Sequence, residues 1–318
     1  MIRRTMLLAA AALLAAGLAA GLSQAKAPGK NGRIAFSRYA LHDTPLTAHI
    51  MVSNSDGTGQ RAITHAASRY ADDEPHWSPD GSRILFERCG FNASCHLWTM
   101  RPNGSGQKQL GPHCRLGAPT SRRCPDDSFP AYGPDGRIAF TRFRGAGGQV
   151  VMVADANLRH ARQIARGSEP GWSPDGTRLV FVAKPGAYQA IFVCNSDGTG
   201  LHRITPWPLR AGNHPDWSPD GTEILFGSGP LGSGNLYTVH PDGTGLRQLT
   251  HYHGASRVSL GSYSPDGKSI VFGTVVGAVN RKGASLNDVF VMAADGTNVR
   301  PVTRAPNFDA HPDWGPGR

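Results

Sequence analysis

The chain has 318 residues, with 33 lysines and arginines against 23 aspartates and glutamates and a formal net charge of +10. This length allows one large domain or two small ones. The basic residues are scattered rather than gathered into runs, so most of the charge is interpreted as a solvated surface and not as a nucleic-acid-binding segment.

The first 25 residues have the pattern of a signal peptide. Arg3 and Arg4 precede an apolar run, and Ser23, Gln24 and Ala25 form a cleavage site of small residues. The alternative is a membrane anchor, but an Ala-rich run of about 17 residues is marginal for crossing a bilayer. We therefore expect residues 1–25 to be removed, with no stable membrane insertion afterwards.

The mature chain, residues 26–318, is then expected outside the cytoplasm, as a secreted, periplasmic or envelope-associated protein. Nucleic acid is not an expected partner there. A basic exported protein is better suited to a protein partner or to an anionic polymer of the cell envelope. We expect it to be a monomer.

Two short phrases alternate along the mature chain. The first phrase is an aromatic residue followed by a turn, and it recurs at intervals of 40 to 55 residues as WSPDG (77–81, 172–176 and 217–221), YGPDG (132–136), YSPDG (263–267) and WGPG (314–317). The second carries an Asp-Gly turn or a variant of it, at 53–64, 101–110, 154–165, 194–205, 240–250 and 293–303. Internal repeats of this length indicate a repeat architecture.

Short apolar runs follow the first phrase, as RILF (83–86), RIAF (137–140), RLVF (178–181), EILF (223–226) and SIVF (269–272). Pro-Asp-Gly and Asp-Gly are strong signals for reversals between strands. Each unit therefore predicts four antiparallel strands, which is typical of a β-propeller blade. One such sheet cannot bury both of its faces alone, whereas a ring of sheets can.

The two ends of the mature chain complement each other. NGRIAF (31–36) lacks the aromatic strand that precedes it in other units, and HPDWGPGR (311–318) supplies such a strand with no blade after it. We therefore predict a single all-β domain over residues 26–318. It is a six-bladed β-propeller of four-stranded antiparallel blades, closed by pairing of the C-terminal strand with the N-terminal blade.

These repeats resemble the TolB-like six-bladed β-propeller family, with its PDG-type WD40-like repeats, over nearly the whole mature chain. The resemblance implies the fold more than the function, because the same blades serve periplasmic binding proteins and the propellers of prolyl peptidases. TolB itself has a separate α/β domain before its propeller, and only a few residues separate the predicted signal peptide from the first strand here. TolB's own role in the envelope is therefore not expected.

The five cysteines fit an oxidising compartment. Cys89 and Cys95 flank one short connection, and Cys114 and Cys124 flank another. Two local disulfides are the simplest pairing, and cross-pairing among the four remains open. Cys194 is expected to be an unpaired thiol at the end of a strand.

Variation in length is confined to the second and fourth connections of each unit, which lie on one face of a four-stranded meander. We call it the variable-loop face and expect a partner to bind there, because loops on a rigid scaffold commonly carry recognition. The alternative is that these loops only cover the strand ends. The candidate residues are Trp207, Arg210, Tyr252 and His253.

A second set of candidates stands just before the aromatic strands, where ring symmetry would bring distant residues to one channel mouth. Carboxylates and imidazoles in this position can hold a divalent cation or recognise a basic or sugar ligand. The alternative is that they bond backbone amides and line a hydrated channel. No other cofactor is expected. The set is Asp73, Glu74, His76, Asp127, Glu169, His214, Asp216, His311 and Asp313.

Linear catalytic motifs are missing from the sequence. GSGPLG (227–232) matches Gly-x-Gly-x-x-Gly, but Pro230 lies inside it and no helix is expected after it, so a dinucleotide site is excluded. No Gly-x-Ser-x-Gly, His-Glu-x-x-His or phosphate-binding loop occurs. We therefore expect a non-catalytic scaffold that binds a protein or envelope polymer. The alternatives are a metal-assisted carbohydrate lyase or hydrolase and, third, a sensor domain.

Overall fold

The computed structural model describes residues 29–40, 47–65, 67, 70–90, 94–115, 120–121, 123–228, 234–253, 257–279, 285–304 and 307–317. The predicted signal peptide lies outside these ranges. Within them, no helix is long and apolar enough to cross a membrane. The helical segments found there are two single 3-10 turns, η1 at Gly145–Gly147 and η2 at Trp207–Leu209. The predicted all-β class is confirmed.

The strands are short and evenly distributed along the chain. Their bounds are β1 Asn31–Ala40, β2 Thr47–Ser53, β3 Arg61–Ala62, β4 Tyr70–Trp77, β5 Ile84–Gly90, β6 Cys95–Met100, β7 Lys108–Gln109, β8 Asp126–Tyr132, β9 Ile138–Phe143, β10 Gln149–Ala154, β11 Arg162–Arg166, β12 Ser168–Trp172, β13 Arg178–Ala183, β14 Ala190–Asn195, β15 His202–Arg203, β16 Asp216–Trp217, β17 Ile224–Ser228, β18 Asn235–Val239, β19 Arg247–Gln248, β20 Arg257–Tyr263, β21 Ser269–Val279, β22 Ser285–Ala293, β23 Arg300–Pro301 and β24 Phe308–Pro316.

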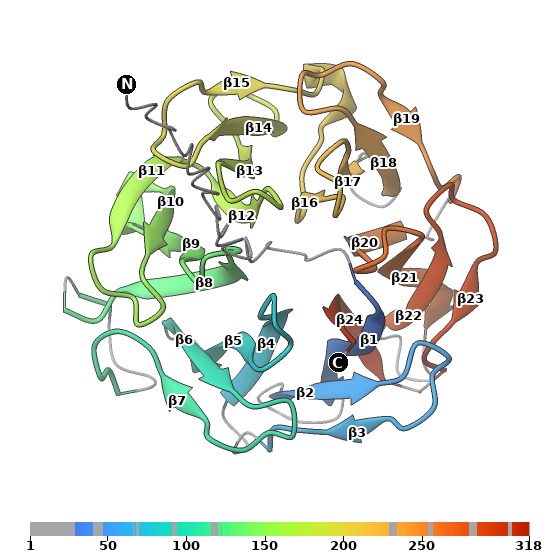
Figure 1. The fold of residues 1–318 in the computed structure, drawn as a ribbon, viewed down its shortest axis with the longest axis horizontal. Helices are drawn as coiled ribbons and strands as arrows, with labels where there is room; N and C mark the ends of the chain where they lie inside the picture. The colour runs from blue at the N-terminus through green and yellow to red at the C-terminus, as the bar shows by residue number, and fades with distance from the viewer. Residues whose placement is uncertain are drawn as a thin grey trace, which may run out of the picture.

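Within the described ranges the strands pair antiparallel in groups of four, as the turn pattern predicts. The groups are β24-β1-β2-β3, β4–β7, β8–β11, β12–β15, β16–β19 and β20–β23. Single parallel contacts, Ala48 with Ala71 and Asn287 with Phe308, join the first group to its two neighbours. The groups surround a common axis, with β4, β8, β12, β16, β20 and β24 innermost (Figure 1).

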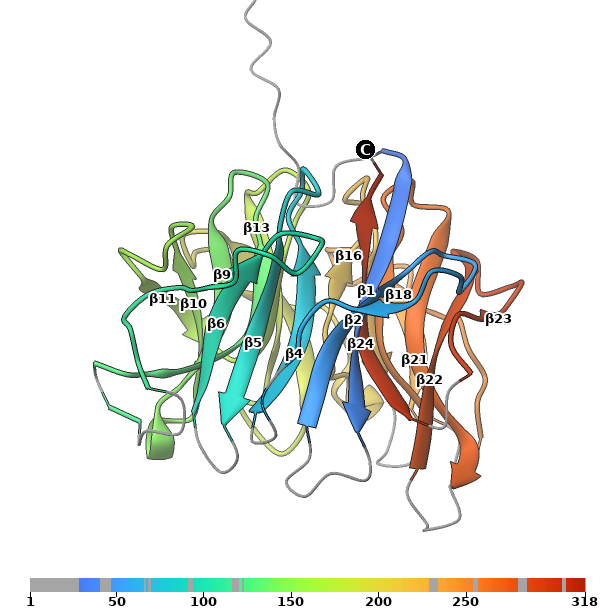
Figure 2. The same cartoon turned by 90° about the horizontal axis from the view of Figure 1, so that it is seen from below.

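One of these groups is built from both ends of the chain. β1 pairs antiparallel with β24, with Ile34 opposite Trp314 and Arg38 opposite Asp309. The Trp314 Nε1 also donates to the Gly32 carbonyl at 3.3 Å. The two strands run side by side in the side view (Figure 2). Residues at opposite ends of the sequence therefore share one sheet.

The Pro-Asp-Gly phrases form tight turns held by their own side chains. At the first, the Ser78 hydroxyl donates to Asp80 Oδ1 at 2.7 Å, and the same oxygen accepts the Ser82 N–H at 2.9 Å. Gly81 has a φ of +64°, which an L-residue adopts only with strain. The same bonds recur in the turns after Trp172 and Trp217.

The core lies between groups rather than within them. Each buried cluster combines strands of two adjacent groups around one of the repeated aromatics. Trp77, for example, packs with Ile50 of β2 and Phe86 of β5. Trp314 packs in a cluster with Val271 of β21, so the groups at the two ends of the chain share a core. Truncating such a buried ring costs about 3–5 kcal/mol.

The outer rim is joined by hydrogen bonds from each group to the next. The first residue of the outermost strand commonly donates to the Asp-Gly turn of the following group. Examples are Arg61 to the Pro102 carbonyl (3.4 Å), Arg162 to Ser196 (2.7 Å), Arg247 to Asp295 (3.4 Å) and Arg300 to Ser55 (2.7 Å). The last of these joins β23 to the first group of the chain.

Gly57 tests this contact between the two ends of the chain. It has a φ of +85°, and a Cβ there would lie 2.3 Å from the Val302 carbonyl oxygen, whereas Gly136, with a φ of +81°, has nothing within 4 Å. We expect Gly57→Ala to lower the free energy of unfolding by about 1–3 kcal/mol more than Gly136→Ala, because only the first overpacks a contact. Denaturant unfolding of both variants measures this. Equal losses would contradict the contact.

Candidate functional site

A left-handed residue followed by proline recurs on the inner side of the ring. The position lies three residues before the aromatic, and its φ is 52° at Glu74, 52° at Phe129, 57° at Glu169, 39° at His214 and 52° at His311. In β4, β8, β12 and β24 it coincides with a register shift in the pairing. Such bulges re-aim side chains, and non-glycine residues in this conformation cost about 1–3 kcal/mol each.

All five of these residues line one small cavity on the axis, together with the prolines that follow them. Its volume is about 80 Å³, enough for a few water molecules or an ion. Pockets that hold drug-sized ligands have about 300–1,000 Å³. The cavity is therefore small compared with such pockets, and its lining combines charged side chains with prolines and Phe129.

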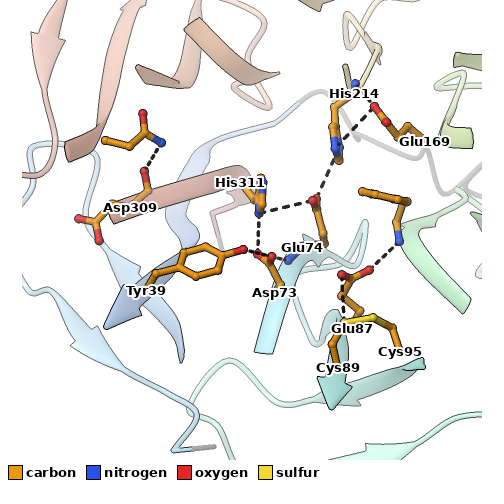
Figure 3. A network of polar contacts seen from close by, with 12 residues as sticks. Tyr39, Asp73, Glu74, Glu87, Cys89, Cys95, Glu169, His214, Asp309 and His311 are labelled. Carbon is orange, nitrogen blue, oxygen red and sulfur yellow. Dashed lines mark hydrogen bonds and ion pairs between the residues drawn. A yellow bond between two sulfur atoms is a disulfide. The ribbon is translucent and has the colours of Figure 1, made fainter. Parts of the chain in front are cut away.

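His311 forms the central ion pair of this cluster (Figure 3). Its Nδ1 lies 2.5 Å from Asp73 Oδ1 and 3.4 Å from Glu74 Oε1. The second oxygen of Asp73 accepts a hydrogen bond from the Tyr39 hydroxyl. Burial alone would lower the pKa of His311, but the carboxylates of Asp73 and Glu74 raise it to about 10. His311 is therefore an imidazolium at neutral pH.

The surroundings of His311 shift the pKa values of Asp73 and Glu74 in opposite directions. Burial alone would raise the pKa of Asp73, but the charge and hydrogen bond of His311 hold it at about 2. Burial raises the pKa of Glu74 well above its usual value, and the carboxylates of Asp73, Glu87 and Glu169 add to this. Asp73 therefore carries the negative charge, while Glu74 holds a proton more readily.

His214 stands across the cavity between two glutamates. Its Nδ1 lies 3.5 Å from Glu74 Oε2, and its Nε2 lies 3.6 Å from Glu169 Oε2. Its ring stacks on His311 with centroids 5.9 Å apart, and Phe129 contacts it edge-on at 5.2 Å. Burial and the neighbouring His311 charge lower the pKa of His214 to about 3. One histidine of the stack is charged and the other is neutral.

Three members of this network were not among the sequence candidates: Tyr39, Glu87 and Phe129. Glu87 is buried on β5, and its Oε2 accepts the Phe129 N–H at 2.9 Å. Its other oxygen lies 3.5 Å from the sulfur of Cys89. Burial raises the pKa of Glu87 to about 8, with a contribution from Asp73. The position before proline would have identified Phe129, but no linear signal identifies the other two.

The predicted residues directly before the aromatics serve a different role. Each accepts the backbone N–H of the aromatic on a neighbouring inner strand, although all three also border the cavity. The bonds are Tyr132 N–H to His76 Nδ1 (3.4 Å), Tyr263 N–H to Asp216 (3.0 Å) and Trp77 N–H to Asp313 (2.7 Å). Of the three predicted histidines, His214 and His311 therefore meet, while His76 joins neighbouring strands.

Asp127 lies outside the cavity lining and binds the Arg142 guanidinium through both oxygens, at 2.7 and 2.8 Å. Burial raises the pKa of Asp127, while Arg142 opposes that shift. This carboxylate is therefore internally paired and does not join the axial cluster.

The candidates on the variable-loop face are placed separately from the cavity. Trp207 begins η2 and lies under the Arg203 guanidinium at 4.4 Å, and Arg210 lies over the Tyr188 ring at 4.8 Å. Tyr252 is half-buried, with its N–H donated to Asn235 at 2.7 Å, whereas His253 is exposed.

The cysteines pair as the simplest prediction has them. Cys89 is bonded to Cys95, and Cys114 is bonded to Cys124. Cys194 is a buried free thiol at the end of β14. Burial raises the pKa of that thiol to about 11, so it is unreactive at neutral pH.

Among the described residues, two groups could hold a cation, and the one formed by Glu87, Cys89 and Cys95 has its two sulfurs in a disulfide, which leaves part of the axial cluster. The ligand atoms of Asp73, Glu74 and His311 lie within 4.8 Å of one another. Carboxylate and imidazole suit divalent transition metals. The imidazolium form of His311 cannot ligate, so a metal would have to displace its proton.

Comparison with known proteins places the fold in a family. A family model described as the TolB beta propeller domain matches residues 128–316. A search of curated protein sequences finds no match.

Several solved structures share the fold at low sequence identity. TolB from Acinetobacter baumannii has a TM-score of 0.71 and 18% identity, over 90% of this chain and 67% of that chain. A putative TolB from Agrobacterium tumefaciens has a TM-score of 0.65 and 19% identity, over 90% and 99%. A chain of a nidogen/laminin complex has a TM-score of 0.62 and 11% identity, over 89% and 98%. Identities this low establish the fold alone.

The His311 ion pair predicts a pH dependence of stability. Its folded pKa, about 10, lies above the unfolded value of about 6.5. The stabilisation is therefore complete below about pH 6.5 and is lost as the pH rises to about 10. We expect the thermal midpoint of the wild type to fall between about pH 6.5 and pH 10. The thermal midpoint of His311→Gln is expected to fall less steeply over the same range. Parallel slopes for the two proteins would contradict the ion pair.

Proposed function

This chain belongs to the TolB beta-propeller domain family, and we propose that it is an exported, non-catalytic, six-bladed propeller that binds a protein or a cell-envelope polymer through its variable-loop face. The ring is closed through β1 and β24. Their antiparallel pairing, the shared core around Trp314 and the bond from Arg300 to Ser55 support this closure.

The observation that carries the proposed function is the rigid presentation of the segment from Trp207 to Gly212. Its carbonyl at Leu209 accepts the Ser228 hydroxyl, Ala211 forms a bridge with Ser228, and Gly212 donates to the Gly227 carbonyl at 3.1 Å. Tryptophan, tyrosine and arginine held on a rigid frame are the side chains that dominate binding energy at interfaces. This rigid frame supports a binding role for the face over the alternative that its loops only cover the strand ends.

The setting and the relatives are consistent with this role. Two disulfides are typical of oxidising, extracytoplasmic compartments. The structural relatives include TolB proteins and a chain solved in a nidogen/laminin complex. These support a protein-binding scaffold, and the identity of the partner stays a proposal.

A second candidate function is a metal-assisted carbohydrate lyase or hydrolase. The convergence of Asp73, Glu74 and His311 favours it, because their ligand atoms lie within metal-bonding range of a common point. The cavity of about 80 Å³ opposes it, since ligand pockets are several times larger. The charged state of His311 opposes it as well.

Changes at exposed positions test the binding face. We expect Arg210→Ala combined with His253→Ala to reduce capture of the partner from an envelope fraction at least about fivefold, because each removes an exposed side chain of this face. The matched control is Arg33→Ala with Lys268→Ala, also exposed but on the turn side. An unchanged thermal midpoint shows that folding is intact. If the first variant captures as much partner as the wild type, the variable-loop face is not the binding surface.

Metal titration tests the second candidate. We expect Ca²⁺, Mn²⁺ or Zn²⁺ at pH 7 to leave the thermal midpoint of the mature chain unchanged, because a ligand that binds only the folded state raises it. Glu74→Gln is the control. A rise in the wild type that this variant abolishes, together with cleavage of an acidic polysaccharide, would establish the enzyme instead.

A further inference from the structure

One set of arginines on the variable-loop face is paired with aspartates of the inner strands. In the first three groups of the chain, an arginine two residues after a buried phenylalanine lies opposite an aspartate on the inner strand. Both carboxylate oxygens bind the guanidinium, at 2.5 to 2.8 Å. The pairs are Arg38 with Asp309, Arg88 with Asp72, and Arg142 with Asp127. These guanidiniums are neutralised from within the protein.

The other three groups lack this pair. The positions of the arginine are occupied by Ala183, Ser228 and Thr274, and Val258 stands opposite the last of them. The positions of the aspartate in the other two groups are Gly167 and Gly212. The aspartates of the inner strand are therefore missing from these three groups, although Asp288 of β22 lies opposite Thr274.

Two arginines are nevertheless present on this half of the face, and their guanidiniums stack on aromatic rings. The Arg203 guanidinium lies 4.4 Å from the centre of the Trp207 ring, which also contacts Phe192 at 6.2 Å. The Arg210 guanidinium lies 4.8 Å from the centre of the Tyr188 ring. Stacking fixes the face of a guanidinium and leaves its N–H edge free for a planar oxyanion.

The two arginines belong to one local unit. Trp207 begins η2 and Arg210 directly follows it, in a left-handed conformation with its N–H donated to the Trp207 carbonyl at 3.1 Å. The bonds from Ser228 and Gly227 hold this turn against the sheet. Both guanidiniums are thus presented by a fixed frame, which reduces the entropy lost on binding.

The stretches of sequence that contain this unit carry no acidic residue. The sequence has no aspartate or glutamate from 176 to 196 or from 198 to 215. Lys184, in the same connection as Tyr188, is a further exposed cation. Within the described part of the chain, neither Arg203 nor Arg210 has a carboxylate partner. Charge complementarity therefore requires an anionic ligand.

The apolar surface of this patch is too small for an ordinary protein interface. Among the described residues, the large hydrophobic side chains that are exposed are Tyr188, Leu201, Leu246 and Val299, and the last three lie on Asp-Gly turns. Protein interfaces usually have an apolar core. A charged polymer needs none, because its affinity comes from repeated ionic contacts.

We propose that the ring-mounted pair Arg203 and Arg210 binds an extracellular polyanion with repeated carboxylate or phosphate groups, each guanidinium taking one oxyanion. This inference rests on the proposed function, because it names the ligand of the same face. Bidentate guanidinium–oxyanion bonds are the stronger and more specific class of charge-assisted hydrogen bond.

Binding of the mature chain to defined polymers tests this at about 0.15 M salt. The probes are polygalacturonate for carboxylate, poly(glycerol phosphate) for phosphate, dextran as a neutral polymer and polyglutamate as an acidic polypeptide. We expect one of the first two to bind and dextran not to bind. The preferred polymer identifies the oxyanion. Polyglutamate carries the same repeated carboxylates, so its binding would also support a carboxylate polyanion, whereas failure of all three anionic polymers to bind would overturn the proposal.

Substitutions then locate the site. We expect Arg203→Gln with Arg210→Gln to weaken polymer binding at least tenfold, since each lost charged hydrogen bond is worth about tenfold. Arg33→Gln with Arg159→Gln removes the same charge from the turn side and is expected to change affinity by less than about twofold. Equal losses in the two double variants would overturn the site.

The lysine variant separates a guanidinium site from general attraction. Arg203→Lys with Arg210→Lys keeps the charge and loses the planar fork, so we expect a loss of at least about threefold. Full retention would overturn the proposed geometry. The two proposals can fail separately. If no polymer binds the wild type, but Arg210→Ala with His253→Ala still reduces capture of a protein partner, the proposed polyanion ligand is wrong and the proposed function stands. If the variant Arg210→Ala with His253→Ala captures as much of the partner as the wild type does, the proposed function is wrong.

Discussion

The antiparallel pairing of β24 with β1 is the constraint on which the rest of the structure depends. β24 carries His311, Asp313 and Trp314, which serve the axial ion pair, the bond to the next inner strand and the core between the first and last groups. None of these contacts can form unless the end of the chain returns to its beginning. A single ladder therefore connects the two ends of the chain, the packing between groups and the electrostatics of the axis.

The axial cluster shows how a repeated backbone irregularity becomes a chemical site. The residue before proline is forced out of the strand path in five units, and its side chain is aimed inwards. What occupies the position is free to vary, and here it is two glutamates, two histidines and one phenylalanine. Because several carboxylates converge there, burial makes all but one of them poor acids, and a single imidazolium compensates Asp73.

The variable-loop face is electrostatically divided by the same repeat. In the first three groups the arginine two residues after the buried phenylalanine is paired with an aspartate across the ladder. In the groups from β12 onwards the pair is missing, and arginines supported by aromatic rings stand free of carboxylates. The arginine–aspartate pair thus occurs in three groups and is missing from the equivalent positions of the other three. The difference arises from a few substitutions at equivalent positions.

Much of the architecture was determined by the sequence alone. Recurring Pro-Asp-Gly and Asp-Gly turns predict four antiparallel strands per unit, because their conformations require those residues. The closely spaced cysteines predict local disulfides. The likeness to the TolB family was carried by the same phrases. These features are local, so linear spacing is sufficient to identify them.

Only the tertiary structure decided which candidates act together. Glu74, Glu169, His214 and His311 meet, whereas His76, Asp216 and Asp313, two residues further along the same phrase, bond neighbouring strands. Glu87 and Tyr39 joined the site from other strands with no motif to mark them. The physical reason is that a bulge changes the direction of each side chain, and ring geometry sets which distant residues it meets. Neither is written in the spacing of the chain.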